Sequence, residues 1–161
     1  MQPDPEIFVL AQQVGERLRK LRKSIAVAES CTGGLLGAAL TDVPGSSAYV
    51  LGGVISYADQ VKVEQLGVPE ATLRRYGAVS EQTAAAMATG VRQRLHADLG
   101  VSITGVAGPE AEGSKPVGLT FIGIAAGAVT THHFQWTGDR WDNRRRSVIA
   151  ALELLVRAPE L

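Results

Sequence analysis

Hydrophobic residues recur at helical spacing near the start of the chain, where one face of residues 5–22 is apolar and the other is charged. A second such pattern begins at Ser80, a favourable N-cap residue. Other helices are indicated by shorter periodic segments between turn residues. The predicted helices span residues 5–22, Gly34 to about Thr41, Val61–Leu66, Pro69–Tyr76, Ser80 to about His96, and 142–156.

Short apolar runs between these helices predict strands. They cover residues 25–28, 49–57, 101–104, 118–126 and 129–136, and the last two can pair as a hairpin across Gly127. Strands that alternate with helices are typical of an α/β protein, and the hairpin adds antiparallel strands. We therefore expect a three-layer α/β/α sandwich with a mixed sheet. Since no repeat or long linker divides the chain, we expect residues 1–161 to form a single domain.

Composition narrows the classes of function. Sixteen basic and sixteen acidic residues give zero net charge, which provides no general attraction for nucleic acid or an anionic membrane. No apolar run reaches the length of a membrane span, and no basic segment precedes an apolar run at the N-terminus. One cysteine cannot form an internal disulfide, so we expect a cytoplasmic protein. The 18 glycines, beside only 5% aromatic residues, predict tight turns or close backbone approaches.

The first glycine-rich loop is the leading candidate for chemistry. A predicted strand runs into Glu-Ser-Cys-Thr-Gly-Gly at residues 29–34 and directly into a helix. Such a turn can present the Thr32 hydroxyl and free backbone N–H groups at the positive end of the helix dipole. Gly33 and Gly34 would let a phosphate or a developing oxyanion approach the backbone. Alternatively, Ser30 or Thr32 only caps the helix, and the glycines ease packing.

Lys62 is the second candidate. If Asp59 caps the short helix that follows, Lys62 falls in its first turn, where the helix dipole repels a cation. Burial there would favour the neutral amine, which can take a proton from a serine hydroxyl. Alternatively, Lys62 is an ordinary solvent-exposed lysine.

Ligand sites in open α/β sheets gather at the carboxyl ends of strands, where the predictions put Ser30, Tyr57 and Thr104. We therefore expect one cleft, surrounded by three glycine loops that contain Gly33, Gly45 and Gly105. Near the C-terminus, Arg140 and Arg144 could bind a phosphate through two parallel hydrogen bonds or could be structural.

Metal and cofactor chemistry finds little support in the sequence. His132 and His133 are adjacent on a predicted strand and so point to opposite faces, and no chelating spacing is present. Neither the dinucleotide fingerprint nor the P-loop motif occurs. Cys31 is a rival nucleophile, but no histidine is placed to activate it, which favours a small buried residue.

Seven ordered motifs resemble one protein family. They are Ala28–Gly34, Pro44–Ser47, Ser56-Tyr57 with Lys62, Gly77–Ser80, Thr104–Pro109, Lys115–Gly118 and Gly138–Arg140. Together they resemble the CinA C-terminal domain, the nicotinamide-nucleotide amidase family. The resemblance implies a three-layer fold and hydrolysis of nicotinamide mononucleotide to nicotinate mononucleotide and ammonia, without metal or cofactor.

The resemblance also implies roles for individual residues. Ser30 matches the nucleophile, Lys62 the general base, and Tyr57 the tyrosine beside that lysine. Lys62 would take the Ser30 proton, protonate the departing ammonia and then activate water, while backbone N–H groups near residues 32–34 or Gly105 stabilise the oxyanion. Residues expected to contact substrate or to support the site are Thr32, Gly33, Gly34, Ser47, Thr104, Gly105, Arg140 and Arg144.

Two departures from the family pattern stand out. Residues 110–113 read Glu-Ala-Glu-Gly where the family often has a glycine pair, and Asp59 replaces an asparagine. Many relatives carry a second, N-terminal domain, and we expect none in these 161 residues. We expect a homo-oligomer that binds a small nucleotide. A non-catalytic nucleotide-binding or regulatory module, and a serine–lysine amidase for another small amide, are the alternatives.

Overall fold

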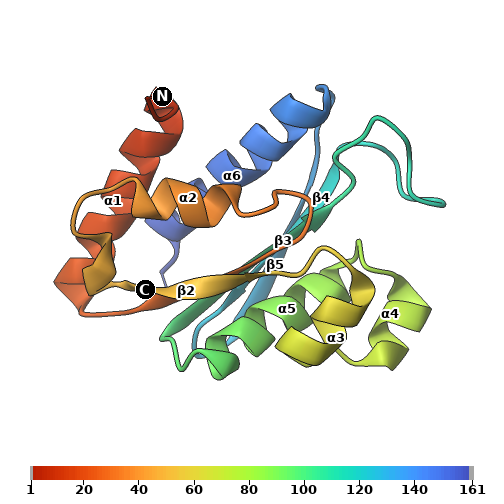
Figure 1. The fold of residues 1–161 in the computed structure, drawn as a ribbon, viewed down its shortest axis with the longest axis horizontal. Coiled ribbons are helices and arrows are strands. Elements are labelled where there is room, and N and C mark those ends of the chain that lie inside the picture. Colours follow the sequence, from red (N-terminus) through yellow and green to blue (C-terminus); the bar gives the residue numbers. More distant parts are fainter. Residues whose placement is uncertain (1, 160–161) are drawn as a thin grey trace.

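The computed structural model describes residues 2–159, in which a five-stranded sheet lies between two layers of helices (Figure 1). The helices are α1 (Pro5–Leu21), α2 (Leu35–Thr41), α3 (Asp59–Leu66), α4 (Glu70–Tyr76), α5 (Glu81–Arg94) and α6 (Arg140–Arg157), with a 3-10 turn, η1 (Ser46–Ala48). The strands are β1 (Ile25–Glu29), β2 (Val50–Ile55), β3 (Leu99–Gly105), β4 (Leu119–Ala125) and β5 (Val129–Gln135).

The sheet is mixed, with strand order β2-β1-β3-β4-β5. β1 runs parallel to both β2 and β3, whereas β4 is antiparallel to β3 and β5. The expected hairpin is therefore present as β4 and β5. The carboxyl ends of β1, β2 and β3 meet at one edge of the sheet, which is where ligand sites form in this class of fold.

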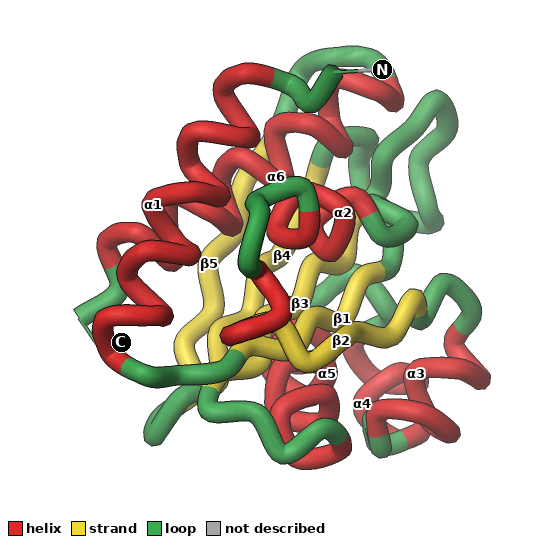
Figure 2. The backbone as a smooth tube through the Cα atoms, turned by 60° about the vertical axis from the view of Figure 1, so that its left-hand side comes forward, coloured by secondary structure: helices red, strands yellow, loops and turns green. Residues whose placement is uncertain are grey.

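The two helical layers confirm the predicted α/β/α sandwich. Helices α1, α2 and α6 cover one face, and α3, α4 and α5 cover the other (Figures 1 and 2). The larger apolar core includes Leu18, Ile103 and Leu152, while a smaller one joins Leu66 of α3 to Met87 of α5. The smaller core fixes α3 against α5, and α3 carries Lys62.

Several glycines serve close packing rather than turns. A Cβ at Gly90 of α5 would overlap the carbonyl oxygen of Leu66, and one at Gly100 of β3 would overlap that of Ala88. Glycine therefore lets α5 approach both the sheet and α3 more closely than any other residue would. Close packing of α5 against the sheet and α3 therefore explains part of the high glycine content.

Several element boundaries differ from expectation by one to a few residues. The strand predicted to reach residue 57 ends at Ile55, and the last helix begins at Arg140 rather than at residue 142. Helix α3 has Ala58 as its N-cap, so the predicted capping role of Asp59 is wrong. Within residues 2–159, no helix is both long and apolar enough to cross a membrane.

Candidate active site

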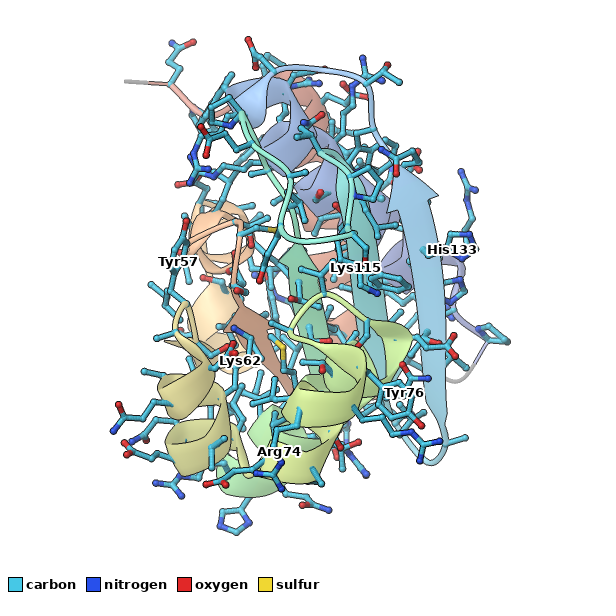
Figure 3. The ribbon with its side chains drawn as sticks, turned by 90° about the vertical axis from the view of Figure 1, so that its right-hand side faces the viewer. Tyr57, Lys62, Arg74, Tyr76, Lys115 and His133 are labelled. Atoms are coloured by element: carbon cyan, nitrogen blue, oxygen red, sulfur yellow. The ribbon has the colours of Figure 1, made fainter. Side chains whose placement is uncertain are left out.

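Ser30 lies just beyond the carboxyl end of the central strand β1. Its backbone N–H donates to the carbonyl of Ile103 in β3 at 2.9 Å, which extends the parallel pairing by one residue. On the other side, the N–H of Ser56 donates to the carbonyl of Glu29 at 2.8 Å. The serine is thus held between the ends of β2 and β3. Figure 3 labels Tyr57 and Lys62, which follow β2 in the chain.

The Lys62 side chain reaches this serine from α3. Its Nζ lies 3.2 Å from Ser30 Oγ and donates to the carbonyls of Ser56, at 2.7 Å, and Tyr57, at 3.2 Å. The lysine is 1% exposed, so the alternative of a solvent-exposed lysine is wrong. A neutral amine has two N–H groups and one lone pair, and a carbonyl can only accept. In the neutral form, whose two N–H groups go to the two carbonyls, the lone pair of Lys62 faces the Ser30 hydroxyl; the charged form donates to it instead.

The surroundings of Lys62 favour that neutral form. Burial lowers the pKa of Lys62 below its ordinary value of 10.5. Asp59, 3.9 Å away and 63% exposed, and Glu112 act in the opposite direction and raise the pKa, but they do not cancel the effect of burial. Burial thus shifts Lys62 toward the neutral amine, which is the form that can accept a proton from a serine hydroxyl.

Cys31, the rival nucleophile, stays a thiol. It is buried, and burial raises the pKa of its thiol to about 12. Since the thiolate is the reactive form of cysteine, Ser30 is the better nucleophile at this site.

A buried carboxylate, Glu29, supports the loop that carries Ser30. Glu29 is 1% exposed, and its Oε2 accepts the Thr32 hydroxyl at 2.5 Å and the N–H of Gly34 at 3.1 Å. The N–H groups of Leu36 and Gly37 also donate to this carboxylate, at 3.1 and 2.8 Å. Glu29 therefore satisfies the first N–H groups of α2. The interpretation from sequence missed it, although a charged residue that ends a buried strand was the available signal.

Glu29 changes the roles of the three residues that follow Cys31. The N–H of Gly34 and the hydroxyl of Thr32 are already bonded, and the N–H of Gly33 donates to the Ser30 carbonyl at 3.1 Å. These groups are not free to bind a phosphate or an oxyanion. Gly34 is required for another reason, since its φ of +102° lies in the left-handed region. The loop that carries Ser30 is thus held in its conformation by Thr32, Gly33 and Gly34.

The end of β3 supplies the opposite wall. The Thr104 hydroxyl donates to the carbonyl of Ala78 at 2.8 Å and ties β3 to the segment before α5. Polar groups along a strand alternate in direction. Since the Ile103 carbonyl faces β1, the N–H of Gly105 points the same way, toward Ser30. The N–H of Gly105, which lines the cavity, is therefore a candidate donor to an oxyanion formed at Ser30.

Tyr57 and Arg140 meet at the mouth of the cavity. One Arg140 nitrogen donates to the Tyr57 hydroxyl at 3.0 Å and another to the carbonyl of Gly108 at 2.6 Å. Tyr57 is 59% exposed, and only its backbone carbonyl contacts Lys62. Its side chain thus lies at the exposed rim of the cavity, with its hydroxyl on Arg140.

Arg144 and Ser47 lie outside the cavity. Arg144 donates to the carbonyl of Thr32 at 2.9 Å and stacks on Trp141, with its Cζ 5.6 Å from the ring centre, so it braces the Ser30 loop. Ser47 is exposed in η1, before β2 begins. β2 runs parallel to β1, so Ser47 lies about 20 Å from the carboxyl edge of the sheet. The expectation that the Gly45 loop borders the same cleft is therefore wrong.

The cavity between these walls has a volume of about 220 Å³. Ser30, Tyr57, Lys62, Thr104, Gly105 and Arg140 all line it. Three carboxylates line it as well, from Asp59, Glu110 and Glu112. Both glutamates that depart from the family pattern thus border the cavity. Within residues 2–159, no cluster of three or more His, Cys, Asp or Glu is arranged to hold a metal ion.

Comparison with known proteins gives consistent matches. The family model described as the CinA C-terminal domain matches residues 8–158. The CinA-like proteins of Thermosynechococcus vestitus and Chlorobium limicola are both 51% identical to the chain, over 92% and 89% of its length. The chain spans only 37% and 35% of those two relatives.

Solved structures match over nearly their whole length. The competence/damage inducible protein CihA from Agrobacterium tumefaciens is 40% identical, with a TM-score of 0.93, and the match covers 97% of this chain and 98% of that one. A competence-damaged protein (CinA) superfamily protein from Escherichia coli is 34% identical, with a TM-score of 0.92, and the match covers 97% and 92%.

Proposed function

Because the chain belongs to the family of CinA C-terminal domains, and its cavity holds a serine beside a buried lysine, we propose that it hydrolyses the carboxamide of nicotinamide mononucleotide to give nicotinate mononucleotide and ammonia. The observation that carries this proposal is the 3.2 Å contact between Ser30 Oγ and Lys62 Nζ, with the lysine fixed by two carbonyls. This arrangement provides a nucleophile and a general base in one buried site.

In the first half of the reaction, Ser30 Oγ attacks the carboxamide carbon and its proton passes to Lys62. The carbonyl oxygen of the substrate becomes an oxyanion, toward which the Gly105 N–H is directed. Removing one such donor costs about 3–4 kcal/mol of transition-state stabilisation in other hydrolases. The tetrahedral intermediate then expels ammonia, which takes its proton from Lys62, and an acyl-serine ester remains.

In the second half, water replaces ammonia. Lys62, neutral again, accepts a proton from water as the oxygen attacks the ester carbon. Collapse of this intermediate breaks the bond to Ser30 Oγ, and Lys62 returns the proton to the serine. The product forms as a carboxylic acid and loses its remaining proton to solvent, so nicotinate mononucleotide leaves as a carboxylate and the enzyme is restored. One lysine thus serves each proton transfer to and from Ser30, ammonia and the attacking water, which requires no group beyond those in the cavity.

Arg140 is our candidate for the phosphate. A guanidinium has five N–H groups, and those that face Gly108 and Tyr57 leave others free. Arg140 also stands in the first turn of the 18-residue helix α6, whose positive end attracts an anion. The phosphate would then sit at the mouth and the carboxamide would point inward to Ser30.

The test is the release of ammonia and nicotinate mononucleotide from nicotinamide mononucleotide by the purified chain. We expect turnover, and we expect Lys62→Met to abolish it while Lys20→Met, an exposed lysine of α1, keeps the wild-type rate. Tight binding of the nucleotide without ammonia release would instead support a binding module. Ammonia release from other small amides alone would support a different amidase.

A further inference from the structure

The charges that line the cavity are unbalanced. Asp59, Glu110 and Glu112 contribute three carboxylates, and Arg140 contributes one guanidinium. Lys62 must be neutral to act as a base, so it adds no positive charge at the start of a reaction cycle. A cavity meant only for a phosphate would be expected to carry the opposite balance.

The backbone of Glu112 is held in position, and the carboxylates of Glu110 and Glu112 are not neutralised. The backbone of Glu112 exchanges two hydrogen bonds with Lys115, N–H to carbonyl, at 3.1 and 2.9 Å, which closes a small hairpin in the loop of residues 106–118. This loop projects past the end of the sheet in Figure 1. Among residues 2–159, neither glutamate side chain forms an ion pair or a hydrogen bond within the protein. Both carboxylates thus remain available to a ligand.

Two of the carboxylates act on the lysine beside Ser30. Asp59 lies 3.9 Å from Lys62 Nζ, and the negative charges of Asp59 and Glu112 both raise the pKa of Lys62. Arg140 is tied to Tyr57 and Gly108. The ring that carries a carboxamide must approach Ser30 and Lys62, so it comes under the negative charge of the carboxylates that line the cavity, whereas a phosphate on the same molecule can bind Arg140.

We propose that Glu110 and Glu112 select substrates whose carboxamide is carried on a positively charged aromatic ring, that is, an N-alkylated pyridinium. This inference rests on the proposed function and assigns the recognition of ring charge to two residues. The pyridinium of nicotinamide mononucleotide has a full positive charge, and its reduced form, the dihydropyridine, has the same sugar, phosphate and amide but a neutral ring. The two carboxylates attract the first ring and gain nothing from the second.

The test compares the affinity of these two nucleotides. We use the Ser30→Ala variant, which prevents turnover, and titrate it calorimetrically with oxidised and with reduced nicotinamide mononucleotide at low ionic strength. We expect the oxidised form to bind at least about tenfold more tightly, a difference of about 1.4 kcal/mol. Adding Glu110→Gln and Glu112→Gln should bring the two affinities to within about threefold.

Glu16→Gln, which removes an exposed carboxylate from α1, is the matched control and should leave the preference intact. Raising the salt concentration should weaken the preference, because the glutamates are exposed and salt screens their charge. Equal affinities for the two nucleotides, a preference that survives both glutamine substitutions, or binding of neither nucleotide would overturn the inference.

The binding test of the two glutamates and the ammonia-release test of the proposed function can succeed or fail independently. If the wild-type chain releases no ammonia but the ring-charge preference depends on the two glutamates, recognition of the cation stands and the amidase proposal fails. If ammonia is released and the preference does not depend on them, the amidase proposal stands and the inference fails.

Discussion

Lys62 is a buried amine whose charged form is disfavoured by folding. Among residues 2–159, only two neutral carbonyls and a hydroxyl lie within hydrogen-bond distance of Lys62 Nζ, and the ion pair with Asp59 is long, at 3.9 Å. An ammonium there would lose most of its hydration without a close counter-charge. The same burial that depresses the pKa of Lys62 must therefore make the stability of the protein depend on pH.

The sign of that dependence follows from the lowered pKa. At a pH between the folded-state pKa and 10.5, the unfolded chain binds a proton at Lys62 that the folded chain does not. The free energy of unfolding therefore rises with pH in this window and is lowest below the folded-state pKa. We expect the stability of wild type minus that of Lys62→Met to be larger at pH 10 than at pH 6. Urea unfolding at both pH values measures it.

Subtracting the free energy of unfolding of Lys62→Met from that of wild type cancels the contributions of the other titrating groups. Lys20→Met serves as the control, since an exposed lysine should give a difference that does not change with pH. A difference for Lys62→Met that stays constant or falls with rising pH would mean that the lysine is an ordinary cation in the folded protein.

At the scale of elements, Glu29 joins β1 to α2. Its carboxylate accepts from one hydroxyl and from three N–H groups at the start of the helix. Because Ser30 lies between Glu29 and these donors, the carboxylate fixes the loop from both ends. Negative charge at a helix N-terminus is also favoured by the helix dipole.

We expect Glu29→Gln to destabilise the protein by about 2 kcal/mol or more. The glutamine amide group would place N–H donors against backbone N–H groups, which leaves buried polar groups unpaired. Urea unfolding measures the change, with Glu16→Gln as the exposed control. A loss below about 0.5 kcal/mol, the usual scatter of surface substitutions, would show that water or rearrangement replaces these bonds.

The approach of α3 to α5 is the second element-scale feature that the site needs. A Cβ on Gly90 of α5 would overlap the Leu66 carbonyl oxygen of α3, the helix that carries Lys62. A side chain at this position must therefore displace α3 or distort it. Neither backbone can yield as easily as a flexible side chain.

Gly90→Ala is expected to destabilise the protein by about 1–3 kcal/mol and to reduce the rate of ammonia release. In an isolated helix, replacing glycine by alanine would stabilise the helix by about 1 kcal/mol. A loss of stability in Gly90→Ala would therefore have to come from the overlap with Leu66. Gly127→Ala, where a Cβ meets no atom within 4 Å, is the control for unfolding and for rate. Unchanged stability in Gly90→Ala would show that α3 can shift freely.

The sequence predicted the elements well because their signals are local. Apolar periodicity located α1 and α5, and the strand runs located β1 and β3. The predicted boundaries were wrong where side chains distant in sequence determine them. Ser56 and Tyr57 were predicted to be in a strand, but their carbonyls accept hydrogen bonds from Lys62 instead. The burial of Lys62 could not be predicted from a short polar helix, because it depends on α3 packing against α5 and the edge of the sheet.

At the scale of the whole molecule, topology decides which motifs meet. Three strands that run parallel bring the segments after Glu29, Ile55 and Gly105 to one edge, although they are distant in sequence. Ser47 precedes β2 rather than following it, so the direction of the strand places it far from the cavity. From the motifs alone, the loops of Gly33, Gly45 and Gly105 were predicted to border one cleft. The order of motifs along the chain does not reveal the direction of each strand in the sheet.

The cavity thus combines Ser30 from the end of β1, Lys62 from α3, Gly105 from β3 and Arg140 from α6. In the reaction that we propose, the central step is attack by Ser30 with Lys62 as the base. The most direct measurement is the initial rate of ammonia release from nicotinamide mononucleotide by Ser30→Ala, compared with wild type at equal concentration of folded protein. We predict a loss of at least about a thousandfold. A Ser30→Ala rate within a few fold of wild type would contradict covalent catalysis by this serine.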